Sequence, residues 1–89
     1  MIRENIRVVN STGLHARPAA ILIKTIKKHE ASVTLINNGK ETVIKGMMGL
    51  LGAGVKGYST IEIICEGADE NRLMSEIKDL FAKGFGEKE

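Results

Sequence analysis

Two spacings of apolar residues alternate along this chain, and they constrain its fold more than any other feature of the sequence. Apolar residues two apart favour a strand with one buried face, whereas apolar residues three and four apart favour a helix. Residues 32–36 and 60–65 show the first spacing, and residues 16–28 show the second. The alternation predicts a protein that combines strands with helices.

The predicted elements run strand, helix, strand, strand, helix, strand, helix. Strands are expected at residues 6–9, 32–36, 41–44 and 60–65, and helices at residues 16–28, 47–51 and 69–83. Asn38 and Gly39 predict a tight hairpin, because both residues tolerate positive φ. This order favours an α+β two-layer sandwich, with one four-stranded antiparallel sheet and the three helices on one face. Since 89 residues can bury one core, residues 1–89 are expected to form a single domain.

Composition and charge bound the class of protein. Aromatic residues make up only 3%, so the core is expected to be aliphatic, and a net charge of +2 does not by itself indicate nucleic-acid binding. The lone Cys65 fits a reducing compartment and is expected to be buried in its strand. The sequence shows neither a membrane-spanning run nor a signal peptide, which makes the cytoplasm the expected location. His15, His29 and Cys65 lack zinc-ligand spacing, so no metal site is predicted, and His29 is expected on the surface or at a helix end.

The junction between the first strand and the first helix contains the residues most suited to chemistry. If His15 is the helix N-cap, the N–H groups of Ala16 and Arg17 precede the first hydrogen bond of the helix, and Pro18 has no N–H to leave unpaired. These donors, the positive end of the helix dipole and the Arg17 guanidinium together form a site that binds an anion.

His15 is the candidate nucleophile of this site. A helix N-terminus disfavours a protonated imidazole, and a neutral ring can attack phosphorus. No Asp, Glu or second His lies nearby in sequence to complete a hydrolytic triad, which favours group transfer over hydrolysis. Gly13 allows close backbone approach, and the Thr12 hydroxyl is a further candidate to bind the phosphate. From this pattern alone, the alternative of a surface histidine followed by a solvated arginine stays open.

The segment Gly13-Leu14-His15-Ala16-Arg17-Pro18-Ala19 resembles the sequence around the active histidine of the HPr family. These proteins are the histidine-containing phosphocarriers of the bacterial phosphoenolpyruvate-dependent sugar phosphotransferase system (PTS). The resemblance extends over nearly the whole chain and includes residues 38–40, 45–50 and 66–71. It implies an open-faced β-sandwich, which agrees with the element order predicted above.

The resemblance also implies the activity, that of a phosphoryl carrier without a cofactor rather than a classical enzyme. Members of the family accept phosphate from phosphorylated enzyme I on the Nδ1 atom of the histidine that matches His15. The arginine that matches Arg17 steadies the phosphoryl group, which then passes to a IIA domain of a sugar permease. By this resemblance the chain is expected to be a monomer with these two kinds of partner, and neither nucleic-acid binding nor membrane insertion is expected.

A docking surface is implied as well, since the family binds its partners through an apolar patch around the short second helix and the first helix. The matching residues are Ala20, Lys24, Lys27, Met47, Met48 and Leu51. Methionine adapts to several partners, and lysine suits acidic partner surfaces. The alternative is that the two methionines and the leucine are core residues, and at least one of the three is expected to be.

Gly46 departs from many Gram-positive members of the family, which have a regulatory serine at this position. Glycine has no hydroxyl, so phosphorylation by the dedicated kinase is not expected there. Two other functions stay open. One is a carrier of the paralogous nitrogen-related branch, which uses the same histidine. The other is a nucleic-acid-binding module, indicated weakly by the GxxG segments at 46–49 and 49–52, because a backbone clamp needs polar or basic residues between its glycines.

Overall fold

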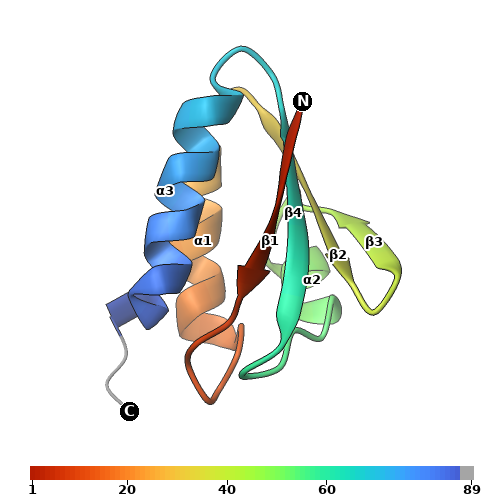
Figure 1. Cartoon of the computed structure of the whole chain (residues 1–89), viewed down its shortest axis with the longest axis vertical. Coiled ribbons are helices and arrows are strands. Elements are labelled where there is room, and N and C mark those ends of the chain that lie inside the picture. Colours follow the sequence, from red (N-terminus) through yellow and green to blue (C-terminus); the bar gives the residue numbers. More distant parts are fainter. Residues whose placement is uncertain (87–89) are drawn as a thin grey trace.

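The elements follow one another in the order β1-α1-β2-β3-α2-β4-α3, as the sequence predicts, and a short 3-10 turn follows α3 (Figure 1). In this computed structural model, which describes residues 1–86, the strands are β1 (Ile2–Arg7), β2 (Ser32–Asn37), β3 (Lys40–Val43) and β4 (Thr60–Glu66). The helices are α1 (Ala16–Lys27), α2 (Met47–Gly52) and α3 (Glu70–Ala82), and the turn is η1 (Gly84–Gly86). Within residues 1–86, no helix has the length and apolar character needed to cross a membrane.

The four strands form one antiparallel sheet in the spatial order β1-β4-β2-β3. The last strand in sequence therefore lies beside the first, with Ile61 of β4 opposite Ile6 of β1. The hairpin between β2 and β3 turns at Asn38 and Gly39, whose φ angles are 54° and 79°. The predicted hairpin and the α+β class are thus confirmed.

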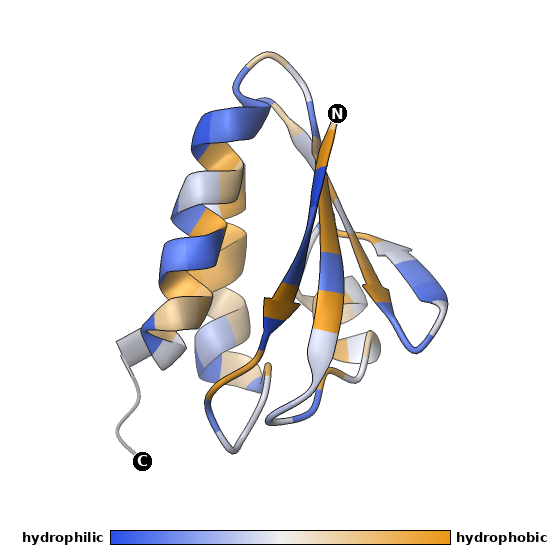
Figure 2. Ribbon diagram, in the orientation of Figure 1, coloured by the Kyte–Doolittle hydropathy of each residue, from blue (hydrophilic) through white to orange (hydrophobic). Residues whose placement is uncertain are grey.

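The helices lie on one face of the sheet, and apolar side chains fill the space between the two layers (Figure 1). The hydrophilic side of α3 faces away from the sheet in Figure 2. Leu22 of α1 and Ile77 of α3 are fully buried, as is Cys65 of β4. Burial, together with the nearby carboxylates of Glu70 and Asp69, raises the pKa of the Cys65 thiol to about 11. The expectation that this cysteine is a buried strand residue is confirmed.

The first strand lies earlier in the chain than predicted, at Ile2–Arg7 instead of residues 6–9. Most of β1 is exposed, and Glu4 stands between Ile2 and Ile6 on the same face of the strand, so apolar alternation does not reveal it. Ile6 and Val8 do point inward as expected, and both are buried. Val8 lies just beyond the strand, where its N–H donates to the Ser59 carbonyl at 2.8 Å.

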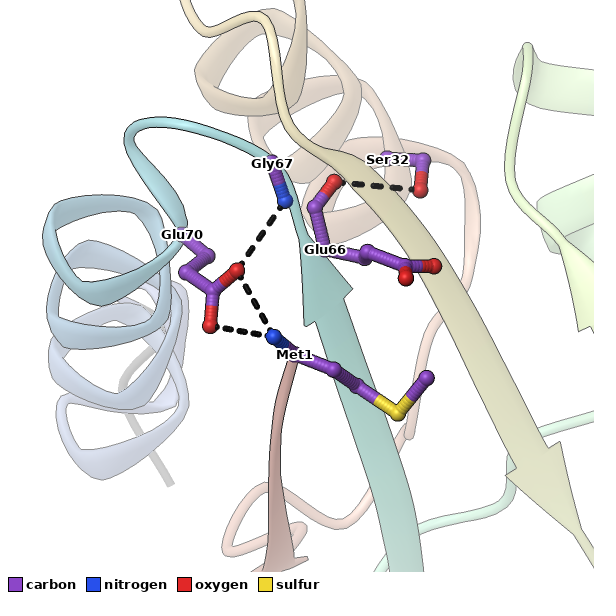
Figure 3. Close-up of polar contacts among 5 residues, drawn as sticks. All are labelled: Met1, Ser32, Glu66, Gly67 and Glu70. Atoms are coloured by element: carbon purple, nitrogen blue, oxygen red, sulfur yellow. Dashed lines mark hydrogen bonds and ion pairs between the residues drawn. The ribbon is translucent and has the colours of Figure 1, made fainter.

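Polar contacts fix the start of α3 at the end of the molecule opposite the β1–α1 connection (Figures 1 and 3). The Glu70 carboxylate accepts a hydrogen bond from the Gly67 N–H at 3.1 Å and another from the Met1 ammonium at 2.9 Å. The Ser32 hydroxyl donates to the Glu66 carbonyl at 3.3 Å, which joins the start of β2 to the end of β4. The strands and the helix are therefore tied together at this end.

Asp69, the N-cap of α3, also holds the connection between α1 and β2. Its carboxylate accepts hydrogen bonds from the Glu30 N–H at 3.0 Å and from the Ala31 N–H at 2.9 Å. Desolvation raises the pKa of this carboxyl, but the backbone hydrogen bonds and the nearby His29 outweigh it. The pKa therefore lies below its usual value.

His29 lies at the end of α1, but its side chain is buried, so the surface alternative is wrong. Only 6% of the side chain is exposed. Nδ1 lies 3.0 Å from the Thr25 carbonyl oxygen, and Nε2 lies 2.8 Å from a carboxylate oxygen of Glu76 on α3. The ring thus joins α1 to α3, at the opposite end of α1 from His15.

We expect Asp69→Asn to destabilise the protein at neutral pH, and to do so less as the pH falls. Because the pKa of Asp69 is lower in the folded state, the ionised carboxylate stabilises the fold above the unfolded pKa. This contribution is lost as the pH falls through the folded pKa. Urea unfolding of both proteins between about pH 7 and about pH 3 measures the difference. Glu70 is present in the wild type and in the variant, so its titration cancels in the comparison. A difference in the free energy of unfolding that does not change with pH would contradict the expectation.

Candidate functional site

His15 is the N-cap of α1, which confirms the local structure predicted for it. Its backbone is extended (φ −84°, ψ −172°), and its side chain makes no capping hydrogen bond. The first backbone bond of the helix runs from the Ala19 N–H to the His15 carbonyl at 3.0 Å. The N–H groups of Ala16 and Arg17 precede this bond, and Pro18 has none. The helix therefore begins with two donors that its own hydrogen-bond ladder does not use, directly after the imidazole.

The surroundings of His15 are open to solvent and favour an anion. His15 is partly buried, whereas Ala16 and Arg17 are exposed. The first turn of α1, which lies within the described part of the chain, contains no acidic residue to repel a phosphate. The helix dipole adds partial positive charge, and the Arg17 guanidinium can form paired hydrogen bonds with phosphate oxygens. This arrangement can stabilise a dianion bonded to the imidazole while a second protein approaches it.

A buried asparagine shapes the turn that precedes His15. Asn10 is only 2% exposed, and its side-chain amide donates to the Gly13 carbonyl at 2.8 Å and to the Thr12 hydroxyl at 3.2 Å. The Gly13 N–H lies 3.4 Å from the Asn10 carbonyl oxygen, to which it donates. These bonds close a compact turn, and they place the Thr12 hydroxyl as part of it, three residues before His15.

This turn packs on a second turn, residues 55–59, which leads into β4; both lie at the same end of the molecule in Figure 1. The Leu14 N–H donates to the Val55 carbonyl at 3.1 Å, which links the two turns immediately before His15. The second turn is closed by its own bond, from the Ser59 hydroxyl to the Lys56 carbonyl at 2.6 Å. The start of α1 is thus held by a segment distant in sequence.

Glycines allow the two turns to come this close. Gly13 has φ +65°, and a Cβ at this position would lie 2.7 Å from the carbonyl carbon of Lys56. A Cβ on Gly57 would overlap the carbonyl of Ser11. Both clashes involve backbone atoms, which cannot rotate away as a side chain can. The position of His15 therefore depends on the absence of side chains at two glycines.

Sequence reasoning located the first turn but not the second. Asn10 lies in the predicted junction between the first strand and the first helix, but no local pattern predicts its burial or points to Val55 and Gly57. No spacing or periodicity links two segments so far apart in the chain. A glycine that precedes a predicted strand indicates only a turn.

The residues predicted to dock partners lie on α1 and α2, which pack against each other. Met48 is 87% exposed and Leu51 is 41% exposed, whereas Met47 is partly buried against the core. Ala20, Lys24 and Lys27 are exposed. Met47 therefore packs at the edge of the core, as one of the three apolar residues was expected to do. Met48, Leu51 and the three exposed residues of α1 stay candidates for docking.

The hollows described in this structure lie away from His15. Two hollows of about 250 Å³ and 280 Å³ lie between β1 and α3, and His15 lines neither of them. Among residues 1–86, no three His, Cys, Asp or Glu side chains are grouped so that they could hold a metal ion. The geometry suits a reaction between two protein surfaces better than the enclosure of a small substrate.

The chain matches a family model described as "PTS HPr component phosphorylation site" over residues 2–83. It is similar to the structure of HPr-C-His from Thermoanaerobacter tengcongensis, with 32% identity, a TM-score of 0.94 and full coverage of both chains. The phosphocarrier protein HPr of Bacillus anthracis is similar at 25% identity and a TM-score of 0.84, over 90% of this chain and 95% of that one. Crh, a catabolite repression protein of Bacillus subtilis described as a swapped dimer, is similar at 27% identity and a TM-score of 0.74, over 94% and 97% of the two chains.

We expect Gly57→Ala to lower the free energy of unfolding by about 1–3 kcal/mol, because the added methyl group displaces the backbone of the turn before His15. Chemical denaturation measures this loss. The matched control is Gly52→Ala in α2, where a Cβ would meet no atom within 4 Å, so it should cause no loss. Equal stability of the two variants would show that the contact between the turns is looser than described.

Proposed function

We propose, from the fact that this chain belongs to the PTS HPr family, that it carries phosphoryl groups between two proteins as a phosphohistidine at His15. Family membership supports the general role of a phosphocarrier. The more specific proposal is that phosphorylated enzyme I is the donor and that IIA domains are the acceptors. The carrier is restored only when both transfers are complete, so it has no turnover of its own.

The observation that carries this proposal is the placement of His15 at the start of α1. Two N–H donors outside the helix ladder follow the ring directly, the helix dipole points its positive end at the same place, and Arg17 lies in the same turn. A histidine that only caps a helix, or that only lies on the surface, does not need all of these features at once. They are the features that a covalently bound phosphate needs.

The chemistry of transfer follows from this arrangement. The lone pair of a neutral imidazole nitrogen, Nδ1 by resemblance to the family, attacks phosphorus, and a nitrogen–phosphorus bond forms. The bond between phosphorus and the donor group breaks at the same time, and the donor keeps that electron pair. The Ala16 and Arg17 N–H groups stabilise the charge on the phosphoryl oxygens. Transfer to the acceptor reverses these steps.

Arg17 and Thr12 complete the proposed phosphate site. The guanidinium binds the phosphoryl oxygens during both transfers, since it is flexible enough to follow the group and stays charged throughout. The Thr12 hydroxyl accepts a hydrogen bond from Asn10 in the turn before His15, and it is the further proposed phosphate ligand. His15 is the nucleophile, and the other groups bind and orient.

Docking is proposed to use the exposed residues of α1 and α2, which adjoin the site. Met48 and Leu51 supply the apolar part, and Ala20, Lys24 and Lys27 supply the rim on α1. We further propose that the protein acts as a monomer in the cytoplasm, and that Gly46 leaves it without the serine switch. Phosphoryl transfer to sugar-type and nitrogen-type IIA domains, measured in parallel, distinguishes sugar uptake from the regulatory branch.

His15→Ala should abolish phosphoenolpyruvate-dependent labelling by enzyme I, because the nucleophile is removed. Labelling with radioactive phosphoenolpyruvate measures the effect, and circular dichroism checks the fold. The only other histidine is His29, so His29→Gln is the matched control and should still be labelled. Label that persists in His15→Ala would remove His15 from the mechanism.

Arg17→Ala should slow phosphoryl transfer roughly 10- to 100-fold, the loss expected for a charge-assisted hydrogen bond, with little change in stability. Stopped-flow or quench-flow transfer from enzyme I measures the rate. Lys28→Ala, which removes an exposed cation at the other end of α1, is the control and should transfer normally. If Arg17→Ala transfers phosphate as fast as Lys28→Ala, Arg17 has no specific part in the transfer.

A further inference from the structure

The chain turns sharply after α3 in a conformation that side chains rarely adopt. Gly84, Phe85 and Gly86 all have positive φ, at 60°, 57° and 77°. Glycine adopts such angles freely, but a residue with a bulky side chain pays a steric penalty. A phenylalanine persists there only where its surroundings stabilise it.

Burial of the Phe85 ring supplies this stabilisation. Phe85 is 6% exposed, and its ring meets that of Phe81 edge to face, with the centroids 4.8 Å apart and the planes at 74°. Aromatic pairs in this geometry are favourable beyond the area that they bury. The ring therefore anchors the turn η1 to the last part of α3.

The anchored turn lies against the residues that lead to His15. A Cβ built on Gly84 would be 3.7 Å from Cβ of Asn10 and 3.7 Å from Cγ2 of Val9, so Gly84 lies next to both side chains, and a side chain at this position would contact them. Val9 also lines the same hollow as Phe81. The turn η1 thus lies beside the buried asparagine whose amide closes the turn before His15.

We infer that Phe85 is a positioning residue for the phosphoryl-transfer site, acting through Gly84 on Val9 and Asn10. This inference rests on the function proposed above. The ring holds η1 in its left-handed conformation, η1 confines Asn10, and Asn10 sets the turn that places His15 at the N-terminus of α1. Without the ring, the turn before His15 has a wider range of conformations, and fewer of them align the imidazole with the donors that follow it.

The test compares Phe85→Ala with Met74→Ala, both of which remove a buried side chain of α3 or its continuation. Met74 lies toward the other end of α3 and lines a hollow with Ile2 and Glu4, away from His15. Phe85→Leu, which restores an apolar side chain, tests rescue. Transfer from enzyme I is measured at a temperature at which circular dichroism shows all variants folded. Nuclear magnetic resonance reports the Asn10 side-chain amide and the exchange rate of the Leu14 N–H.

Phe85→Ala should slow transfer about 10- to 100-fold, as expected for a displaced reacting group. It should also shift the Asn10 amide signals and speed exchange of the Leu14 N–H. Met74→Ala should leave all three readouts near wild type, and Phe85→Leu should recover most of the rate. The inference is wrong if Phe85→Ala matches Met74→Ala in rate, or if the rate falls while the Asn10 and Leu14 signals stay unchanged. If the wild type itself accepts no phosphate, the proposed function fails, and the two resonance readouts alone decide whether Phe85 orders the turn.

Discussion

The close backbone contact between the turn before α1 and the turn before β4 is the constraint on which the site depends. The two turns lie so close that neither Gly13 nor Gly57 could carry a side chain. The Leu14 N–H links the turns by a hydrogen bond to the Val55 carbonyl. Because β4 lies beside β1 in the sheet, the turns that follow β1 and precede β4 arrive at the same end of the molecule. The sheet topology thus brings together two segments that build one histidine site.

The groups beside His15 are mainly backbone groups, and this has a functional consequence. Backbone N–H donors at a helix start recognise charge and geometry, not the identity of a substrate. His15 is partly exposed and Arg17 is exposed, so in the proposed transfer different partners reach the same phosphate. Selectivity must then come from the surface around the site, where α1 and α2 present exposed apolar and basic side chains. An exposed site beside the proposed docking surface fits the proposed exchange with more than one protein.

Local sequence patterns predicted most of the fold and the helix start at His15, but not the contacts that hold this start in place. Helical spacing located α1, and the strand-to-helix junction placed His15 as N-cap, because both depend on neighbours in sequence. The predicted first strand begins too late, because Glu4 interrupts the apolar alternation between Ile2 and Ile6. The burial of His29 against Glu76, and the contact of Gly57 with Ser11, depend on which elements meet in space. The spacing of residues along the sequence does not show which distant segments come into contact, so these contacts are seen only in the tertiary structure.

Phosphate held at the start of α1 must change the environment of the amides that bind it. The most direct test is a ¹H–¹⁵N resonance spectrum of the protein before and after phosphorylation by enzyme I. The account predicts that the amide protons of Ala16 and Arg17 move strongly downfield in the phosphorylated form, while amides at the far end of α1 stay in place. Phosphorylation that leaves the Ala16 and Arg17 amides unchanged would contradict it.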